Sequence, residues 1–186
     1  MKVLNRQYHR NQDREQGFTL IELVITIAII AIIAAMAAPS MQRQIQQAKT
    51  NDAANIIEAA LKDAKSQALI TQKNIKVVLT NTSTAKNLKL FNVGDNTSTA
   101  TTQQMFNLDN SITLTANPTT LTAVSFTPNK KAYQGDTGTG TLMGQDSNGA
   151  AMTTGFSVCL GTATQKYSVN VDANGNVSTQ ENGVCP

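Results

Sequence analysis

Residues that could carry catalytic or metal-binding chemistry are few in this chain of 186 residues. The single histidine, His9, lies in the polar segment at the N-terminus. Residues 18–186 therefore offer no histidine for a Ser-His-Asp site, a Cys-His site or a histidine metal site. A glycine-rich phosphate loop of P-loop or Rossmann spacing is also missing. We predict no catalytic residue, no metal site and no cofactor, and we expect that the protein is not an enzyme.

The stretch Asp172-Ala-Asn-Gly-Asn176 hints at a calcium-binding loop. Its glycine falls two positions early for an EF-hand, and the distal glutamate is missing. Asn-Gly between two alternating apolar runs is instead a strong signal for the turn of a β-hairpin. We interpret this stretch as a turn, with a metal site as the alternative, and we expect another turn at Asp146-Ser-Asn-Gly149.

The two cysteines, Cys159 and Cys185, both lie near the C-terminus. Disulfides form and persist in oxidising compartments outside the cytosol. In an exported chain we expect the two thiols to pair, and the bridge would stabilise the fold by about 3 kcal/mol through loop closure. The alternative is two unrelated free thiols.

A carboxylate, Glu22, lies at the start of a long apolar run. The 20 residues between Glu22 and Arg43 carry no charge. About 20 apolar residues in a helix can span a bilayer core. An ionised side chain inside such a helix costs about 2.5–3.5 kcal/mol and therefore usually has a partner. The sequence predicts a transmembrane helix, with a position of Glu22 at the headgroup level as the inexpensive alternative.

The polar segment before this run is net positive, which favours an N-terminus in the cytoplasm. A removable secretory signal is the rival interpretation, because Ala35-Met36-Ala37 fits the pattern that signal peptidase cuts. The long polar region and the carboxylate within the run argue against such a signal. A buried core helix is a further alternative, which the length of the aliphatic run disfavours.

The stretch Gly17-Phe18-Thr19-Leu20-Ile21-Glu22, followed by an aliphatic run and Pro39, resembles the cleavage and methylation segment of type IV pilins and of the related type II secretion pseudopilins. The resemblance implies that prepilin peptidase cuts between Gly17 and Phe18 and that Phe18 is then N-methylated. It also implies that Glu22 meets the new amine of a neighbouring subunit and fixes the axial register. Pro39 is expected to kink or loosen the helix, where the family's helix can melt during assembly.

Beyond Pro39 the apolar residues recur at spacings of three and four, the pattern of a helix with one buried face. This stripe comprises Ile45, Ala48, Ala53, Ile56, Ile57, Ala60, Leu61, Ala64, Ala68 and Leu69. Glu58 and Lys62 are spaced to form a favourable pair. We predict one helix from Phe18 to about Thr71, with its first half in a bilayer or filament core and its second half against a head.

From Asn74 onward, short β-branched segments separated by Thr-, Ser- and Asn-rich stretches predict strands. The expected strands are 74–80, 87–93, 111–115, 121–126, 155–160, 166–171 and 177–179. The glycine-containing region 127–154 is expected to form a long loop or an irregular hairpin.

The predicted fold class is α+β, a long N-terminal helix packed on a β-rich C-terminal head, which the resemblance identifies with the pilin-like fold. The expected segments are a leader removed by prepilin peptidase, a transmembrane or filament-core helix, its amphipathic continuation, and a periplasmic head with the C-terminal disulfide. Their limits are 1–17, 18–42, 43–72 and 73–186.

The head also resembles the GspH/FimT/FimU group of minor pilins and pseudopilins. The cues are Ser125-Phe126-Thr127-Pro128, a glycine-rich stretch, a strand with Cys159 and a terminal hairpin. This resemblance implies a minor pilin that acts in assembly initiation or in the tip complex of a type IV pilus, with twitching motility, adhesion or DNA uptake as the process served. The alternative is a type II secretion pseudopilin.

The implied partners are other pilin or pseudopilin subunits, prepilin peptidase and an inner-membrane assembly platform. The implied location is the inner membrane, with a single pass and a periplasmic head, or the assembled pilus or pseudopilus. DNA is a less expected partner, although FimT-type relatives can be DNA receptors through a Gly-Arg-x-Arg pattern at the terminal hairpin. The corresponding stretch here, Gly175-Asn-Val-Ser178, has no arginine, and lysines 130, 131 and 166 are few and scattered along the sequence. DNA binding therefore stays a second alternative.

Overall fold

A computed structural model describes residues 17–95, 102–161 and 164–186, apart from the side chain of Ala38. Of the predicted leader, all but Gly17 lies outside the described residues. Helix α1 (Leu20–Thr71) comes first, and short strands follow in two antiparallel sheets. The chain divides into two compact units that meet between Met41 and Gln42, and we describe each unit by itself.

Helix α1 is continuous over 52 residues, close to the predicted span. Pro39 lies inside it. Proline lacks the N–H that would bond to the carbonyl four residues back, yet the residues on both sides of Pro39 are helical. The expected loosening therefore does not appear as a break in the helix. The part that Pro39 plays in assembly stays a prediction.

In the first unit, the side chains of α1 are exposed, and its most apolar stretch is entirely unburied within the chain. By length and composition this part of α1 could cross a membrane. Its large exposed side chains are Leu20, Ile21, Leu23, Val24, Ile25, Ile27, Ile29, Ile30, Ile32, Ile33, Met36 and Met41. An aliphatic surface of this extent is stable only when lipid or other protein covers it.

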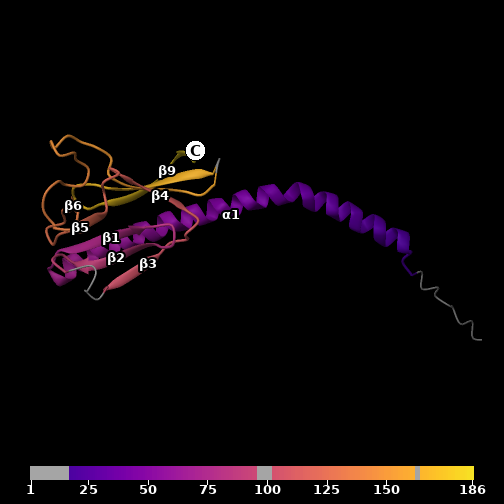
Figure 1. Cartoon of the computed structure of the whole chain (residues 1–186), viewed down its shortest axis with the longest axis horizontal. Helices are drawn as coiled ribbons and strands as arrows, with labels where there is room; N and C mark the ends of the chain where they lie inside the picture. Colours follow the sequence, from indigo (N-terminus) through magenta and orange to yellow (C-terminus); the bar gives the residue numbers. More distant parts are fainter. Residues whose placement is uncertain (1–16, 96–101, 162–163) are drawn as a thin grey trace, which may run out of the picture. The chain divides into compact units, whose positions relative to one another are not determined.

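In the second unit, the remainder of α1 buries one face against the head (Figure 1). The buried residues are Thr50, Ala53, Ala54, Ile57, Ala60, Leu61, Ala64 and Ala68. Alanine side chains are small, so the helix backbone can come close to the sheets. Two residues of the predicted stripe, Ile45 and Ala48, are exposed. The packed stripe begins at Thr50, later than the sequence suggested.

Sheet A has five strands in the order β3-β2-β1-β5-β6. They are β3 (Gln104–Asn107), β2 (Lys86–Asn92), β1 (Ile75–Asn81), β5 (Ala123–Phe126) and β6 (Ala132–Gln134). Alternation places Ile75 and Val77 of β1 in the core, because successive side chains of a strand point to opposite faces.

Sheet B has four strands in the order β4-β7-β8-β9. They are β4 (Thr113–Asn117), β7 (Gly155–Cys159), β8 (Gln165–Val171) and β9 (Val177–Val184). Phe156, Val158, Val169 and Val171 from this sheet join the same core as α1 and sheet A. The predicted pilin-like arrangement of one long helix on antiparallel sheets is confirmed.

Two strands were missed in the sequence, and both lie at the edges of sheet A. Strand β3 pairs with β2 at one edge, and β6 pairs with β5 at the other. Strand β6 falls in the region 127–154, where a loop or irregular hairpin was expected. The same region also supplies the fully buried Met143. The prediction for 127–154 was therefore incomplete, because part of this region belongs to the sheet and the core.

Candidate functional site

Thr19 and Glu22 close the start of α1 with a reciprocal set of hydrogen bonds. The backbone N–H and the hydroxyl of Thr19 both donate to Glu22 Oε2, each at 3.0 Å. The backbone N–H of Glu22 donates to Thr19 Oγ1 at 3.3 Å. This is a capping box, in which a Thr before the helix and a Glu three residues later satisfy backbone donors of the first turn.

The capping box gives Glu22 a partner within its own chain. A negative charge at a helix N-terminus is also favoured by the helix dipole. The Thr-x-x-Glu spacing of residues 19–22 is a sequence signal for this cap, although the partner expected from the sequence lay on another subunit. The pairing of Glu22 with the amine of a neighbouring Phe18 stays a prediction, because a single chain does not test it.

Gly17 and Phe18 lie just outside the helix and are exposed. The side chain of Phe18 is 89% exposed. A peptide bond in exposed, non-helical chain is accessible to a peptidase. Both Thr19 groups that donate to Glu22 lie beyond the bond between Gly17 and Phe18. A cut there would therefore leave the capping box intact.

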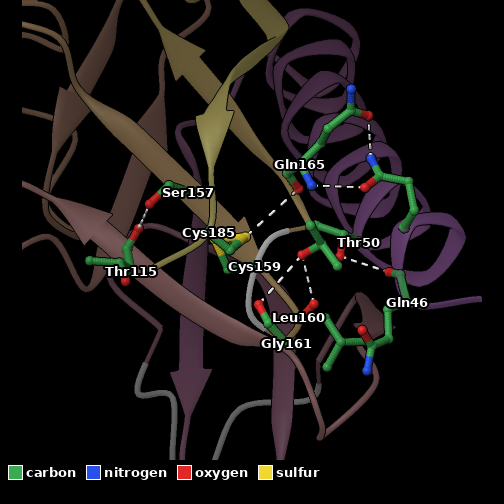
Figure 2. Close-up of a disulfide and its surroundings, with 11 residues drawn as sticks. Gln46, Thr50, Thr115, Ser157, Cys159, Leu160, Gly161, Gln165 and Cys185 are labelled. Atoms are coloured by element: carbon green, nitrogen blue, oxygen red, sulfur yellow. Dashed lines mark hydrogen bonds between the residues drawn. A yellow bond between two sulfur atoms is a disulfide. The ribbon is translucent and has the colours of Figure 1, made fainter. Parts of the chain in front are cut away.

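Cys159 and Cys185 form a disulfide, with their Cα atoms 5.6 Å apart (Figure 2). The predicted pairing is confirmed, and the alternative of two free thiols is wrong. Cys159 ends β7, whereas Cys185 follows β9. Since β8 lies between these two strands, the bridge fastens the C-terminal segment across β8. The backbone N–H of Cys185 also donates to the carbonyl of Thr164 at 2.8 Å.

Gln47 of α1 is tied to the start of β8 close to this disulfide. Its Nε2 donates to Gln165 Oε1 at 2.6 Å and to the Tyr167 hydroxyl at 3.2 Å. The backbone N–H of Gln165 donates back to Gln47 Oε1 at 2.8 Å. Gln165 is labelled beside the helix in Figure 2. A lone glutamine on a polar helix face gives no sequence signal for such a long-range contact.

Glu58 ties α1 to the last strand of sheet B. Its carboxylate accepts hydrogen bonds from Lys62, one turn further along the helix, and from Thr179 of β9. These hydrogen bonds, that of Lys62 first, hold the pKa of Glu58 below its ordinary value. The predicted Glu58–Lys62 pair is present, and Thr179 is the partner that the sequence did not indicate.

Asp172 organises the turn between β8 and β9. Its Oδ1 accepts the backbone N–H groups of Asn174 and Asn176 at 2.9 and 2.8 Å. Asp146 makes the same pair of bonds, two and four residues onward, each at 2.8 Å. Both stretches are therefore turns, as predicted. Among the residues that the structure describes, no cluster of three or more His, Cys, Asp and Glu could hold a metal ion.

Two lysines that are distant in the sequence meet at this β8–β9 turn. Lys65 Nζ donates to the Asn174 carbonyl at 3.1 Å, and Lys131 Nζ donates to Asn174 Oδ1 at 2.9 Å. The carbonyl of Lys130 also lies close to Gly175 of the turn. Lys130 and Lys131 are therefore less scattered in space than along the sequence. Lys166 lies on the outer face of sheet B.

Residues 12–38 match the prokaryotic N-terminal methylation motif. Two crystal structures of the type IV minor pilin FimU from Pseudomonas aeruginosa have a similar fold, with TM-scores of 0.53 and 0.54 at 15% sequence identity. The alignments cover 73% and 74% of this chain and 99% and 95% of the FimU chains. No curated protein sequence matches the chain.

Type IV pilin-like proteins are defined by an N-terminal methylation motif that leads into one long apolar helix. This chain has that motif and helix, and its head has a fold similar to that of a minor pilin. The motif match supports the pilin resemblance expected from the stretch Gly17 to Glu22, and the head has a fold similar to that of the minor pilin FimU. Members of this class are structural subunits, and the motif and helix fit a membrane-anchored pilin.

Proposed function

We propose that this chain is a minor pilin of a type IV pilus, which acts in the initiation of assembly or in the tip complex. The observation that carries the proposal is the methylation motif over residues 12–38, because it covers the expected processing point and the start of an uncovered apolar helix. The FimU-like fold of the head supports a minor pilin.

In this proposal, prepilin peptidase removes residues 1–17 and Phe18 becomes an N-methylated terminus. The first part of α1 then anchors the subunit in the inner membrane, with the head in the periplasm. The net positive segment before the helix supports this orientation. The disulfide between Cys159 and Cys185 supports an oxidising compartment for the head.

Glu22 has a further hydrogen-bonding oxygen for the assembly step. Both bonds from Thr19 go to Oε2, and Oε1 accepts none from the residues that the structure describes. A carboxylate has about four lone-pair sites in all. We infer that the amine of a neighbouring Phe18 binds at Oε1 while the capping box persists. Opposite charges attract strongly at low dielectric, so this contact sets the axial register of the subunits.

A fractionation experiment tests the assembly role. Wild-type chain and the E22Q variant are expressed in a strain that lacks the chain, and surface fibres are sheared off and probed with antibody. We expect the wild type in the fibre fraction and at least about tenfold less E22Q, because an amide loses the charge, although it can still accept bonds from Thr19. E181Q, a change at an exposed position of β9, is the matched control. Equal incorporation of E22Q would contradict the assembly role of Glu22.

A strain from which this chain is deleted distinguishes a role in a pilus from a role in type II secretion. We expect loss of surface pili and of twitching, restored by the wild-type chain. Normal pili with lost secretion of type II substrates would instead make the chain a pseudopilin. This outcome would overturn the pilus assignment but leave the processing steps in place.

DNA binding by the head is the second candidate function, and the meeting of Lys65 and Lys131 at the β8–β9 turn favours it. Basic side chains near one another can neutralise neighbouring phosphates. Both of these amines already donate to Asn174, which weakens the candidate. A low-salt gel shift with the full chain in detergent micelles tests it. Salt-sensitive, submicromolar binding that the K65M/K131M pair abolishes would support DNA binding, whereas no shift would exclude it.

A further inference from the structure

We propose that the outer face of sheet B is a binding site for an acidic saccharide. The site is a hollow of about 470 Å³ on the face turned away from the core. Its lining includes Asn117, Ser157, Lys166, Ser168, Asn170 and Asn182. All of these residues belong to the second unit, so the proposal does not depend on the proposed role in a pilus.

The alternation of β8 separates its apolar and polar side chains onto two faces. Val169 and Val171 are buried in the core. Lys166, Ser168 and Asn170 therefore lie on the opposite face, because strand side chains alternate. The register aligns hydroxyl and amide residues across the four strands, in the row Thr115, Ser157, Ser168 and Gln180. Figure 2 shows Thr115 beside Ser157 in this row.

Gly155 allows strands β7 and β8 to approach closely beside the hollow. Its φ of +153° lies in a region that L-residues rarely adopt, and a Cβ would lie 2.0 Å from the Val169 carbonyl oxygen. No residue with a side chain fits at this position without moving β8. The bare backbone of Gly155 therefore sets the close strand spacing at this end of the hollow, where its cross-strand neighbours Asn117 and Asn170 lie on either side.

Several polar groups of the hollow have hydrogen-bonding capacity to spare. Ser168 is only 9% exposed, yet its hydroxyl lines the hollow and makes no hydrogen bond to a residue that the structure describes. Asn117 uses Nδ2 on the Thr153 carbonyl at 2.7 Å, which leaves its Oδ1 free to accept. These groups face the hollow, so a hydrogen-bonding ligand can take the place of water on them.

The residues that line the hollow indicate which class of ligand it would bind. Serine, threonine and asparagine side chains both donate and accept, which suits the hydroxyl groups of a sugar. Among the described residues that line the hollow, Lys166 alone is charged, so a single anionic group on the ligand is favoured. Phe156 also borders the hollow, but it is 97% buried in the core and offers no face for stacking a base. A sugar carboxylate therefore fits better than a nucleic acid.

Calorimetric titration of the full chain in detergent micelles tests the proposal. The probe is tetragalacturonate, with neutral maltotetraose and an oligothymidylate as comparison ligands. We expect tetragalacturonate to bind, maltotetraose to bind at least about tenfold more weakly because it lacks the carboxylate, and the oligothymidylate not to bind. The K166M variant should weaken tetragalacturonate binding about tenfold, or about 1.4 kcal/mol.

Two further variants test the proposal independently of K166M, in case that variant is unstable. N170D places a carboxylate in the hollow at almost constant size and should weaken binding more than K166M does, through charge repulsion. K89M removes a lysine from β2 of sheet A, outside the hollow, and should leave binding unchanged. No binding of tetragalacturonate, equal losses in K166M and K89M, or binding of the oligothymidylate alone would each overturn the proposal.

Discussion

At the residue scale, Thr19 and Glu22 form a helix cap, and the proposed function gives the Glu22 carboxylate a second role in assembly. The capping box uses one oxygen of the carboxylate, and the other makes no bond to the described residues. The sequence singled out Glu22 as a carboxylate at the start of an apolar run, and its role in assembly stays a prediction. Residues 19–22 also carry the capping-box pattern. This pattern is recognised only when the carboxylate is considered as a local hydrogen-bond acceptor.

Replacement of Thr19 by valine should loosen the first turn of α1. Valine keeps the shape of threonine but loses the hydroxyl that exchanges bonds with Glu22. The loss of an N-cap costs about 1 kcal/mol, so amide exchange at residues 20–23 should become about fivefold faster in micelles. T26V is the matched control, because the Thr26 hydroxyl bonds only to the Leu23 carbonyl. Equal exchange rates in T19V and T26V would contradict the role of the cap.

Acid should weaken the β8–β9 turn through Asp172. Burial raises the pKa of Asp172, but hydrogen bonds from Asn176 and Asn174 and the charge of Lys65 outweigh burial, so the pKa lies below its ordinary value of 3.8. A pKa lowered by folding stabilises the head above the unfolded value, and this stabilisation is lost as the pH falls through the folded value.

The D172N variant tests this pH dependence. At pH 7 it should lower the free energy of unfolding by about 1 kcal/mol, the scale of a hydrogen bond to a charged but exposed group. Well below pH 3.8 the difference from wild type should shrink. Thermal unfolding followed by circular dichroism at both pH values measures it. D52N changes an exposed carboxylate of α1 and is the control. If D172N is less stable than the wild type by the same amount at both pH values, the charge of Asp172 does not stabilise the turn.

At the element scale, periodicity predicted the long helix and most of the strands, but it failed where strands depend on a neighbour. Strand β3 is short, its residues are almost all exposed, and among the described residues it pairs with β2 alone. Strand β6 is three residues long within a glycine-containing region. Neither has an alternating apolar pattern of its own, so tertiary pairing decides its conformation. For the same reason the contact of Gln47 with Gln165 and Tyr167 was beyond sequence reasoning.

Loss of the disulfide should loosen the C-terminal part of sheet B without affecting α1. Cys159 and Cys185 are separated by 26 positions, and the closure of such a loop stabilises the fold by about 3 kcal/mol. In the C159S/C185S variant, limited proteolysis should cut within residues 160–186 much faster than in the wild type. Reduced wild type should behave like this variant. Unchanged protease resistance of the C-terminal segment in both would show that the bridge is dispensable.

At the scale of the whole molecule, helix α1 contributes to both compact units. Its first part is uncovered and apolar, and its second part is packed in the head. From Gln42 onward, α1 belongs to a unit with a buried core shared by both sheets. Before that point its aliphatic side chains have no cover within the chain. The proposed pilin function explains this division, because a membrane would cover the exposed part before assembly and other subunits would cover it afterwards.

The chemical identity of the mature N-terminus tests the central claim most directly. The chain is purified from membranes of its own bacterium, and its N-terminal peptide is sequenced by mass spectrometry. The account predicts a chain that begins at N-methylated Phe18, with residues 1–17 removed. A chain that begins at Ala38, after cleavage by signal peptidase, or one that retains residues 1–17 would contradict it.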